Sequence, residues 1–156
     1  MSPKKRSMSF DDAVNCHSEW KNRLHDYVAS PDHSLRVEDV AADHKSKLGQ
    51  WIRGEGKKYS AYPEFARLMA EHTSFHKAAA EIVRRADRGE DVSGEFALGV
   101  GSEFSLASSV VVLALMDMKK RHEMQEQGAR EQARMREQDQ AHGQVRVRKQ
   151  AAGWGK

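Results

Sequence analysis

The segment of residues 104–118, FSLASSVVVLALMDM, limits what this chain can fold into, because a helix over it is apolar on nearly every side. Such a helix must be buried on several faces. A membrane span needs roughly 20 apolar residues, and extending the segment backwards to that length takes in Glu103, Gly101 and Gly99. We therefore expect a helix in the core of a bundle or at a dimer interface, and no membrane span.

Two other stretches place apolar residues at helical spacing, and the alternation typical of strands is almost absent. The first follows Ser9, a good N-cap, and the second begins at Pro63, which suits a first helical turn. Between them, residues 35–56 predict one or two short helices, and Ser93 is expected to cap the last long helix. The predicted apolar faces are Phe10, Ala13, Val14, His17, Trp20, Leu24, Tyr27 and Val28, and Phe65, Leu68, Met69, His72, His76, Ala79 and Val83. The expected fold is all-α, a four-helix bundle with an additional short helical segment.

Charge is unevenly distributed along the chain. Residues 9–118 hold 13 Lys/Arg and 18 Asp/Glu, whereas residues 1–8 carry +3 and residues 119–156 hold 10 basic and 5 acidic side chains. We therefore divide the chain into a basic N-terminal tail (1–8), a helical bundle (9–118) and a basic, Gln/Glu/Arg-rich extension (119–156). The extension is expected to be helical at first and disordered past about Ala141. Charged ends of this kind are usually solvated, so no nucleic-acid partner is expected.

Cys16 is the only cysteine in the sequence, which excludes an intramolecular disulfide and a zinc site with several cysteines. The N-terminal MSPKKRSM lacks the apolar segment of a secretory signal. Both features favour a cytoplasmic, reducing setting.

Three of the eight histidines fall on the predicted apolar faces. His72 and His76 are four residues apart, so a helix places both imidazoles on one side, where they can share a metal ion. His17 lies on the apolar face of the first helix. Buried imidazoles need partners for their ring nitrogens, and a divalent metal would gather all three. The pattern leaves open three separate histidines bonded to backbone groups or carboxylates.

Four short motifs resemble those of one family when they are taken in order. They are H-x-x-W at His17–Trp20, D-H-x-x-x-L-G-x-W at Asp43–Trp51, Y-P-E-F at Tyr62–Phe65 and H-x-x-x-H at His72–His76. Together they resemble the CZB family, the chemoreceptor zinc-binding domain of bacteria, over residues 10–118. The resemblance implies a cytoplasmic helical bundle that forms a homodimer and holds one zinc through three histidines and a cysteine. His17, His72 and His76 match the three histidines.

The sequence departs from the family at the cysteine, because Ser46 precedes the L-G-x-W motif where the family has its fourth ligand. A thiolate binds zinc strongly because it is soft and anionic, whereas a serine hydroxyl is neutral near pH 7. The resemblance therefore implies a weaker zinc site, with Ser46, Asp43 or a water molecule in the fourth position.

The resemblance favours a cytoplasmic zinc-binding sensory or regulatory module, which acts through a homodimer or a bacterial signalling partner. Neither a chemoreceptor hairpin nor a cyclase accompanies it in the sequence, so we expect a stand-alone module. The alternative is a metal-free helical interaction module that keeps the fold. A small zinc hydrolase is less favoured, because no general base is evident; we therefore expect no enzyme and assign no catalytic residue.

Overall fold

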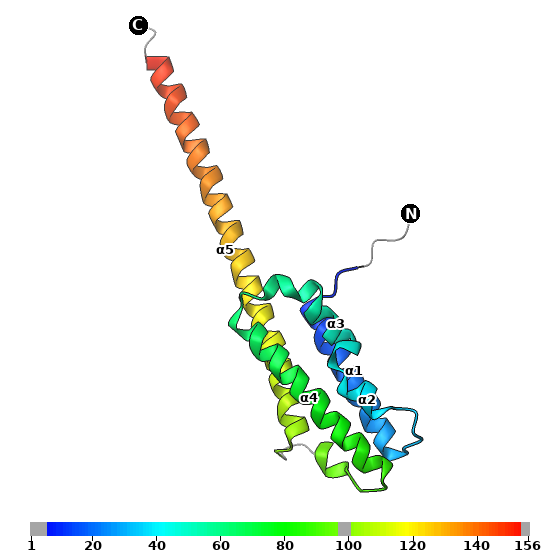
Figure 1. The fold of residues 1–156 in the computed structure, drawn as a ribbon. Helices are drawn as coiled ribbons and strands as arrows, with labels where there is room; N and C mark the ends of the chain where they lie inside the picture. The colour runs from blue at the N-terminus through cyan, green and yellow to red at the C-terminus, as the bar shows by residue number, and fades with distance from the viewer. Residues whose placement is uncertain (1–5, 97–100, 154–156) are drawn as a thin grey trace, which may run out of the picture. The chain divides into compact units, whose positions relative to one another are not determined.

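A computed structural model describes residues 6–96 and 101–153, with side chains as far as residue 149. All regular elements in these ranges are helical (Figure 1). The α-helices are α1 (Phe10–Ala29), α2 (Val37–Ala41), α3 (Lys47–Arg53), α4 (Pro63–Asp87) and α5 (Glu103–Gly153). Short 3-10 helices occur at Asp43–Lys45 (η1), Glu55–Tyr59 (η2) and Ser93–Phe96 (η3). The all-α prediction is confirmed.

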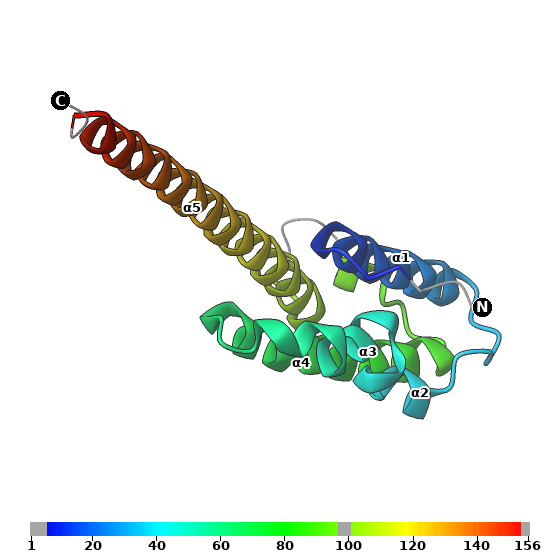
Figure 2. The ribbon, with the colours of Figure 1, turned by 90° about the horizontal axis from the view of Figure 1, so that it is seen from above.

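The chain divides into two compact units, Met1–Lys119 and Lys120–Lys156. In the first unit, α1, α4 and the part of α5 up to Lys119 surround a common core. The short helices cover this core. Figure 2 shows α2 beside α4, with which it is in contact, and α3 contacts α1. The second unit contains the remainder of α5.

The helix ends follow local chemistry. Ser9 accepts a hydrogen bond from the backbone N–H of Asp12, and the Asp12 carboxylate accepts one from the N–H of Ser9, so the predicted N-cap of α1 is a complete capping box. Pro63 opens α4 as predicted. The prediction for Ser93 was wrong, because Ser93 begins the short η3. At the start of α5, the hydroxyl oxygen of Ser102 instead accepts a hydrogen bond from the backbone N–H of Ser105 in the first turn.

The core consists of two clusters of buried apolar side chains. One joins α1, α2, α4, η3 and the start of α5, and includes Leu24, Val40, Phe75 and Phe104. The other joins α1, α3, α4 and the next turns of α5, and includes Trp51. Met69, which we placed on the apolar face of α4, is 45% exposed, because that face is narrower than the sequence pattern suggests.

The apolar segment 104–118 is only partly covered. Within the first unit its side chains at Phe104, Val111, Leu115 and Met118 are buried. The side chains of Leu106, Leu113 and Met116 are 56–57% exposed. None of the helices in the described ranges is long and apolar enough to span a membrane.

In the second unit, helix α5 extends closer to the C-terminus than the sequence predicted. We expected disorder past about Ala141, whereas α5 continues to Gly153. The physical reason is local, because residues 142–153 contain no proline and more than half of them are Gln, Arg, Lys or Ala, which have high helix propensity.

The segment that carries α3 is folded tightly onto η1. A Cβ atom added to Gly49 would lie 1.9 Å from the carbonyl oxygen of Asp43, which is backbone and cannot move independently. The glycine of the L-G-x-W motif is therefore required by close backbone approach, and it fixes the position of Ser46 at the start of α3.

We predict that Gly49→Ala lowers the free energy of unfolding by about 3 kcal/mol or more, because the added methyl group forces η1 and α3 apart. Chemical denaturation of the full chain measures this change. Gly128→Ala is the control, because a Cβ there meets no atom within 4 Å and the substitution favours the helix. An unfolding midpoint for Gly49→Ala equal to that of the unmodified chain would contradict the prediction.

Candidate metal site

Two buried histidines of α4 face each other. His72 and His76 lie one helical turn apart, and both side chains are about 2% exposed. Their Nε2 atoms are 3.1 Å apart. The sequence spacing predicted that the two imidazoles share a side of the helix, and the structure brings the same nitrogen of each ring together.

The proton position on His76 is set by the backbone of α2. His76 Nδ1 lies 2.8 Å from the carbonyl oxygen of Val40, which can only accept, so Nδ1 carries the proton. In a neutral ring Nε2 is then unprotonated, so it accepts the hydrogen bond between the two rings and His72 Nε2–H donates it. Burial lowers the pKa of His76, and burial together with the neighbouring His76 lowers the pKa of His72 to about 3. Both rings are therefore neutral at pH 7.

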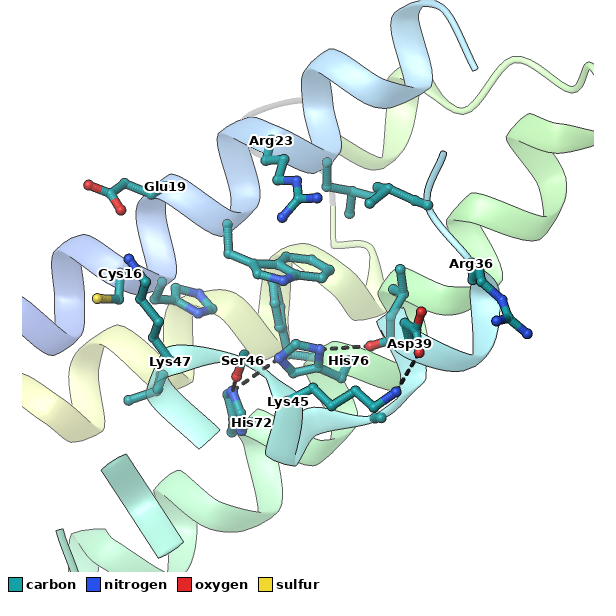
Figure 3. A pocket seen from close by; sticks show the side chains of 18 of the residues that line it. Cys16, Glu19, Arg23, Arg36, Asp39, Lys45, Ser46, Lys47, His72 and His76 are labelled. Atoms are coloured by element: carbon teal, nitrogen blue, oxygen red, sulfur yellow. Dashed lines mark hydrogen bonds and ion pairs between the residues drawn. The ribbon is translucent and has the colours of Figure 1, made fainter. Parts of the chain in front are cut away.

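Ser46 lies beside this pair. Its Oγ is 3.3 Å from His72 Nε2, so the residue that we predicted as a candidate for the fourth ligand position is next to one of the predicted histidines (Figure 3). The hydroxyl is also the N-cap of α3, because it accepts a hydrogen bond from the N–H of Gly49. It donates to the carbonyl oxygen of Asp43 at 2.9 Å. Ser46 thus has a structural role as well as its place beside the histidines.

The carboxylate of Asp43 is already engaged. The hydroxyl of Thr73 donates to Asp43 Oδ2 at 2.6 Å, and Arg53 contacts Oδ1 at 3.2 Å. Burial raises the pKa of Asp43, but the hydrogen bonds from Thr73 and Arg53 outweigh it and hold the pKa below its usual value. Asp43 would have to give up these partners to act as a metal ligand.

His17 has a different partner. Its ring, about 3% exposed, places Nε2 2.9 Å from Oγ of Ser108 in α5. Burial is the main reason that the pKa of His17 is lowered to about 4, and Lys21 and His76 add to the effect. Within the part of the chain that the structure describes, no three His, Cys, Asp or Glu side chains lie close enough to hold a metal ion together. The structure therefore brings His72, His76 and Ser46 together and bonds His17 to Ser108.

Aromatic rings pack against His17 and against the pair. Phe75 lies 4.5 Å from the His17 ring and Trp20 lies 4.8 Å from the His76 ring, measured between ring centroids. We did not include Phe75 in the predicted apolar face, although its position three residues after His72 is a helical spacing that could have revealed it. Phe75 is fully buried and orders the inner wall of the site.

A cavity of about 470 Å³ opens between α1 and the α2–α3 segment. Its lining includes the three predicted histidine ligands and Ser46, whereas Asp43, the other candidate for the fourth position, is not among the lining residues. Cys16 also lines it, and its sulfur points away from the histidine pair in Figure 3. Burial raises the pKa of the Cys16 thiol, so this thiol is protonated at neutral pH.

The histidine pair fits a zinc ion. Nitrogen ligands bind tetrahedral zinc at about 2.0–2.1 Å, which separates two such nitrogens by about 3.3 Å. The Nε2 atoms of His72 and His76 are 3.1 Å apart. His76 also has the second hydrogen bond that orients most metal-bound imidazoles, here to Val40.

Comparison with protein families gives one match, over residues 17–83, to the chemoreceptor zinc-binding domain. This segment belongs to that family. The match begins at His17 and includes Ser46, His72 and His76, so the family resemblance read from the motifs is confirmed. Comparison with curated proteins and with solved structures gives no match. The match names a zinc-binding domain of chemoreceptors for residues 17–83, and the predicted extension of the resemblance to residues 10–118 stays a prediction outside that segment.

The histidines predict how the stability of the domain depends on pH. Unfolded histidines titrate near pH 6.5, whereas the folded pKa values of His17 and His72 are about 4 and about 3. Below about pH 6.5 the unfolded state binds protons that the folded state does not. The free energy of unfolding is therefore highest above pH 6.5 and falls as the pH drops towards 4, by up to about 1.4 kcal/mol per pH unit for each histidine.

Urea denaturation with a chelator present, at several pH values in this range, measures the slope. His72→Gln should make it shallower, because it removes a buried imidazole whose pKa is lowered in the folded state. A free energy of unfolding that does not change between pH 6.5 and 4 would contradict the assignment of neutral buried histidines.

Proposed function

We propose that this domain is a cytoplasmic, zinc-responsive regulatory module in which His72, His76 and His17 bind the metal. The observation that carries the proposal is the His72–His76 pair, with its Nε2 atoms 3.1 Å apart and the proton of His76 held on Nδ1 by Val40. The lowered pKa values support it, because neutral imidazoles bind metal at pH 7 without first losing a proton.

His17 is the third ligand in this proposal because it lines the same cavity and is also buried and neutral at pH 7. It belongs to α1, whereas the pair belongs to α4. When bound, zinc would supply a divalent charge that links the two helices and adds its binding free energy to the stability of the fold. Binding would thereby change the packing of α1 against α4.

Ser46 weakens the site in this proposal. Its hydroxyl is neutral and holds the start of α3 through Gly49, so it contributes less to a zinc ion than a thiolate would. The fourth position then falls to Ser46 or to water, since Asp43 is bound to Thr73 and Arg53. We infer an affinity suited to reversible binding.

The signal would pass through a homodimer. Leu106, Leu113 and Met116 form an exposed apolar stripe on α5, which we call the α5 stripe. A second copy of the chain is the occupant we propose, because an isologous dimer covers the same stripe on both subunits and the family resemblance implies a homodimer.

A metal-free helical interaction module is the second candidate. One observation favours it: each of the three histidines already has a hydrogen-bond partner in the fold. His17 is bonded to Ser108, His72 to Ser46 and His76 to Val40. Metal analysis separates it from the first candidate.

We predict that the purified chain binds one zinc ion and that His76→Ala largely abolishes binding, because the substitution removes one nitrogen of the pair. Metal analysis and the thermal shift on adding zinc measure this, and His25→Ala is the control because His25 is exposed. A chain that holds no zinc and shows no thermal shift would overturn the metal-responsive function and favour the metal-free module.

Ser46→Cys tests the fourth position in the same assays. A thiolate placed beside His72 should raise zinc affinity by at least about tenfold. An unchanged affinity would show that position 46 is not at the metal, even if zinc binds.

We also predict that Leu113→Glu together with Met116→Glu yields a monomer, because charges on the α5 stripe must be desolvated in an apolar interface. Analytical ultracentrifugation measures the oligomeric state. Asn15→Glu is a control on the exposed side of α1. The stripe would not be the interface if the double variant remained dimeric, and there would be no homodimer if the unmodified chain were monomeric.

A further inference from the structure

Four polar side chains are buried in the described residues, and they are His17, His72, His76 and Ser108. Three are the proposed zinc ligands, and the fourth is bonded to one of them. Ser108 lies in α5, 91 residues from His17 in the sequence, and outside the segment that matches the family. It is not among the residues that line the cavity, and it reaches the site only through its bond to His17.

The bond of Ser108 differs from those of the other serines in this part of α5. Ser109 donates to the carbonyl oxygen of Ser105 in the preceding turn, and Ser102 and Ser105 donate to the carbonyl oxygen of Glu95. The hydroxyl of Ser108 instead meets an imidazole nitrogen of α1 at 2.9 Å. A buried hydroxyl without a partner costs about 1–3 kcal/mol, so this bond determines whether a serine is tolerated at the position.

A ring nitrogen of a neutral imidazole holds either one proton or one electron pair. His17 Nε2 therefore cannot be bonded to the hydroxyl of Ser108 and to a metal ion at the same time. His72 and His76 face each other through Nε2, the nitrogen that Ser108 occupies on His17. Recruiting His17 through this atom would break the bond between α1 and α5.

We infer that Ser108 competes with the metal for His17, and so lowers zinc affinity and couples the binding of zinc to α5. This inference rests on the proposed zinc function. When His17 turns to the metal, the Ser108 hydroxyl must find another partner, and the carbonyl four residues earlier in its own helix is within reach of a serine side chain. The loss of the bond between Ser108 and His17 therefore acts on α5, which continues without a break to Gly153. We thus infer that α5 is the element that responds to the binding of zinc.

The experiment measures the zinc affinity of the full chain by competition with a chelator of known affinity. Ser108→Ala removes the competing partner, so zinc should bind about 3–10-fold more tightly, the equivalent of one net hydrogen bond. Ser109→Ala is the matched control, because it removes a neighbouring hydroxyl that bonds only within α5, and its affinity should be unchanged. An affinity for Ser108→Ala that is unchanged or weaker overturns the inference, and a weaker one would show that Ser108 positions the ligand.

A double-mutant cycle with His17→Ala tests the route of the effect. In that background Ser108→Ala should no longer change zinc affinity, because the competition acts only through His17. If Ser108→Ala still raises zinc affinity in the His17→Ala background, the inference is overturned. If the unmodified chain binds zinc and Ser108→Ala does not bind it more tightly, only this inference fails. If neither protein binds zinc, the proposed zinc function fails as well.

The side-chain nitrogen signals of His17 in NMR spectra provide a readout that does not depend on affinity. Zinc should shift the Nε2 signal of the unmodified chain away from its hydrogen-bonded position, and in Ser108→Ala the same signal should differ from the unmodified one before zinc is added. A zinc-induced shift on Nδ1 with Nε2 unchanged would overturn the competition between Ser108 and the metal.

Discussion

The hydrogen bond from His76 Nδ1 to the Val40 carbonyl is the interaction on which the site depends. It joins α4 to α2 and satisfies a polar atom in a buried position, where an unpaired group would destabilise the fold. It also fixes the proton of His76 on Nδ1, so that Nε2 accepts the hydrogen bond from His72 Nε2. The same bond therefore stabilises the helical packing and prepares the chemistry of the histidine pair.

The segment between α2 and α3 adapts the site to a serine. Gly49 allows the backbone of α3 to approach Asp43, and Ser46 caps α3 while its hydroxyl lies beside His72. A cysteine at this position would place its sulfur beside His72. Such a change would leave the rest of the segment unchanged, so the fold and the metal affinity are separate questions for this protein.

Local sequence signals predicted most of the helices and part of the site. The cap at Ser9, the start at Pro63 and the spacing of His72 and His76 all act within one or two helical turns, and the structure agrees with each. Ser93 misled the prediction because it begins the short η3, where its N–H donates to the Asp91 carboxylate. The helix past Ala141 was missed because charged composition suggested disorder, whereas no proline interrupts α5 there.

The sequence by itself determined the all-α class, the family of residues 17–83 and the positions beside which a metal could bind, because helical periodicity and short motifs are local. The tertiary structure alone decided the partners of those positions. Nothing local relates His17 to Ser108, or Asp43 to Thr73, since these contacts form only when distant helices pack. Burial then makes each such bond obligatory, so packing decides which ring nitrogens are engaged by the protein and which face one another across the cavity.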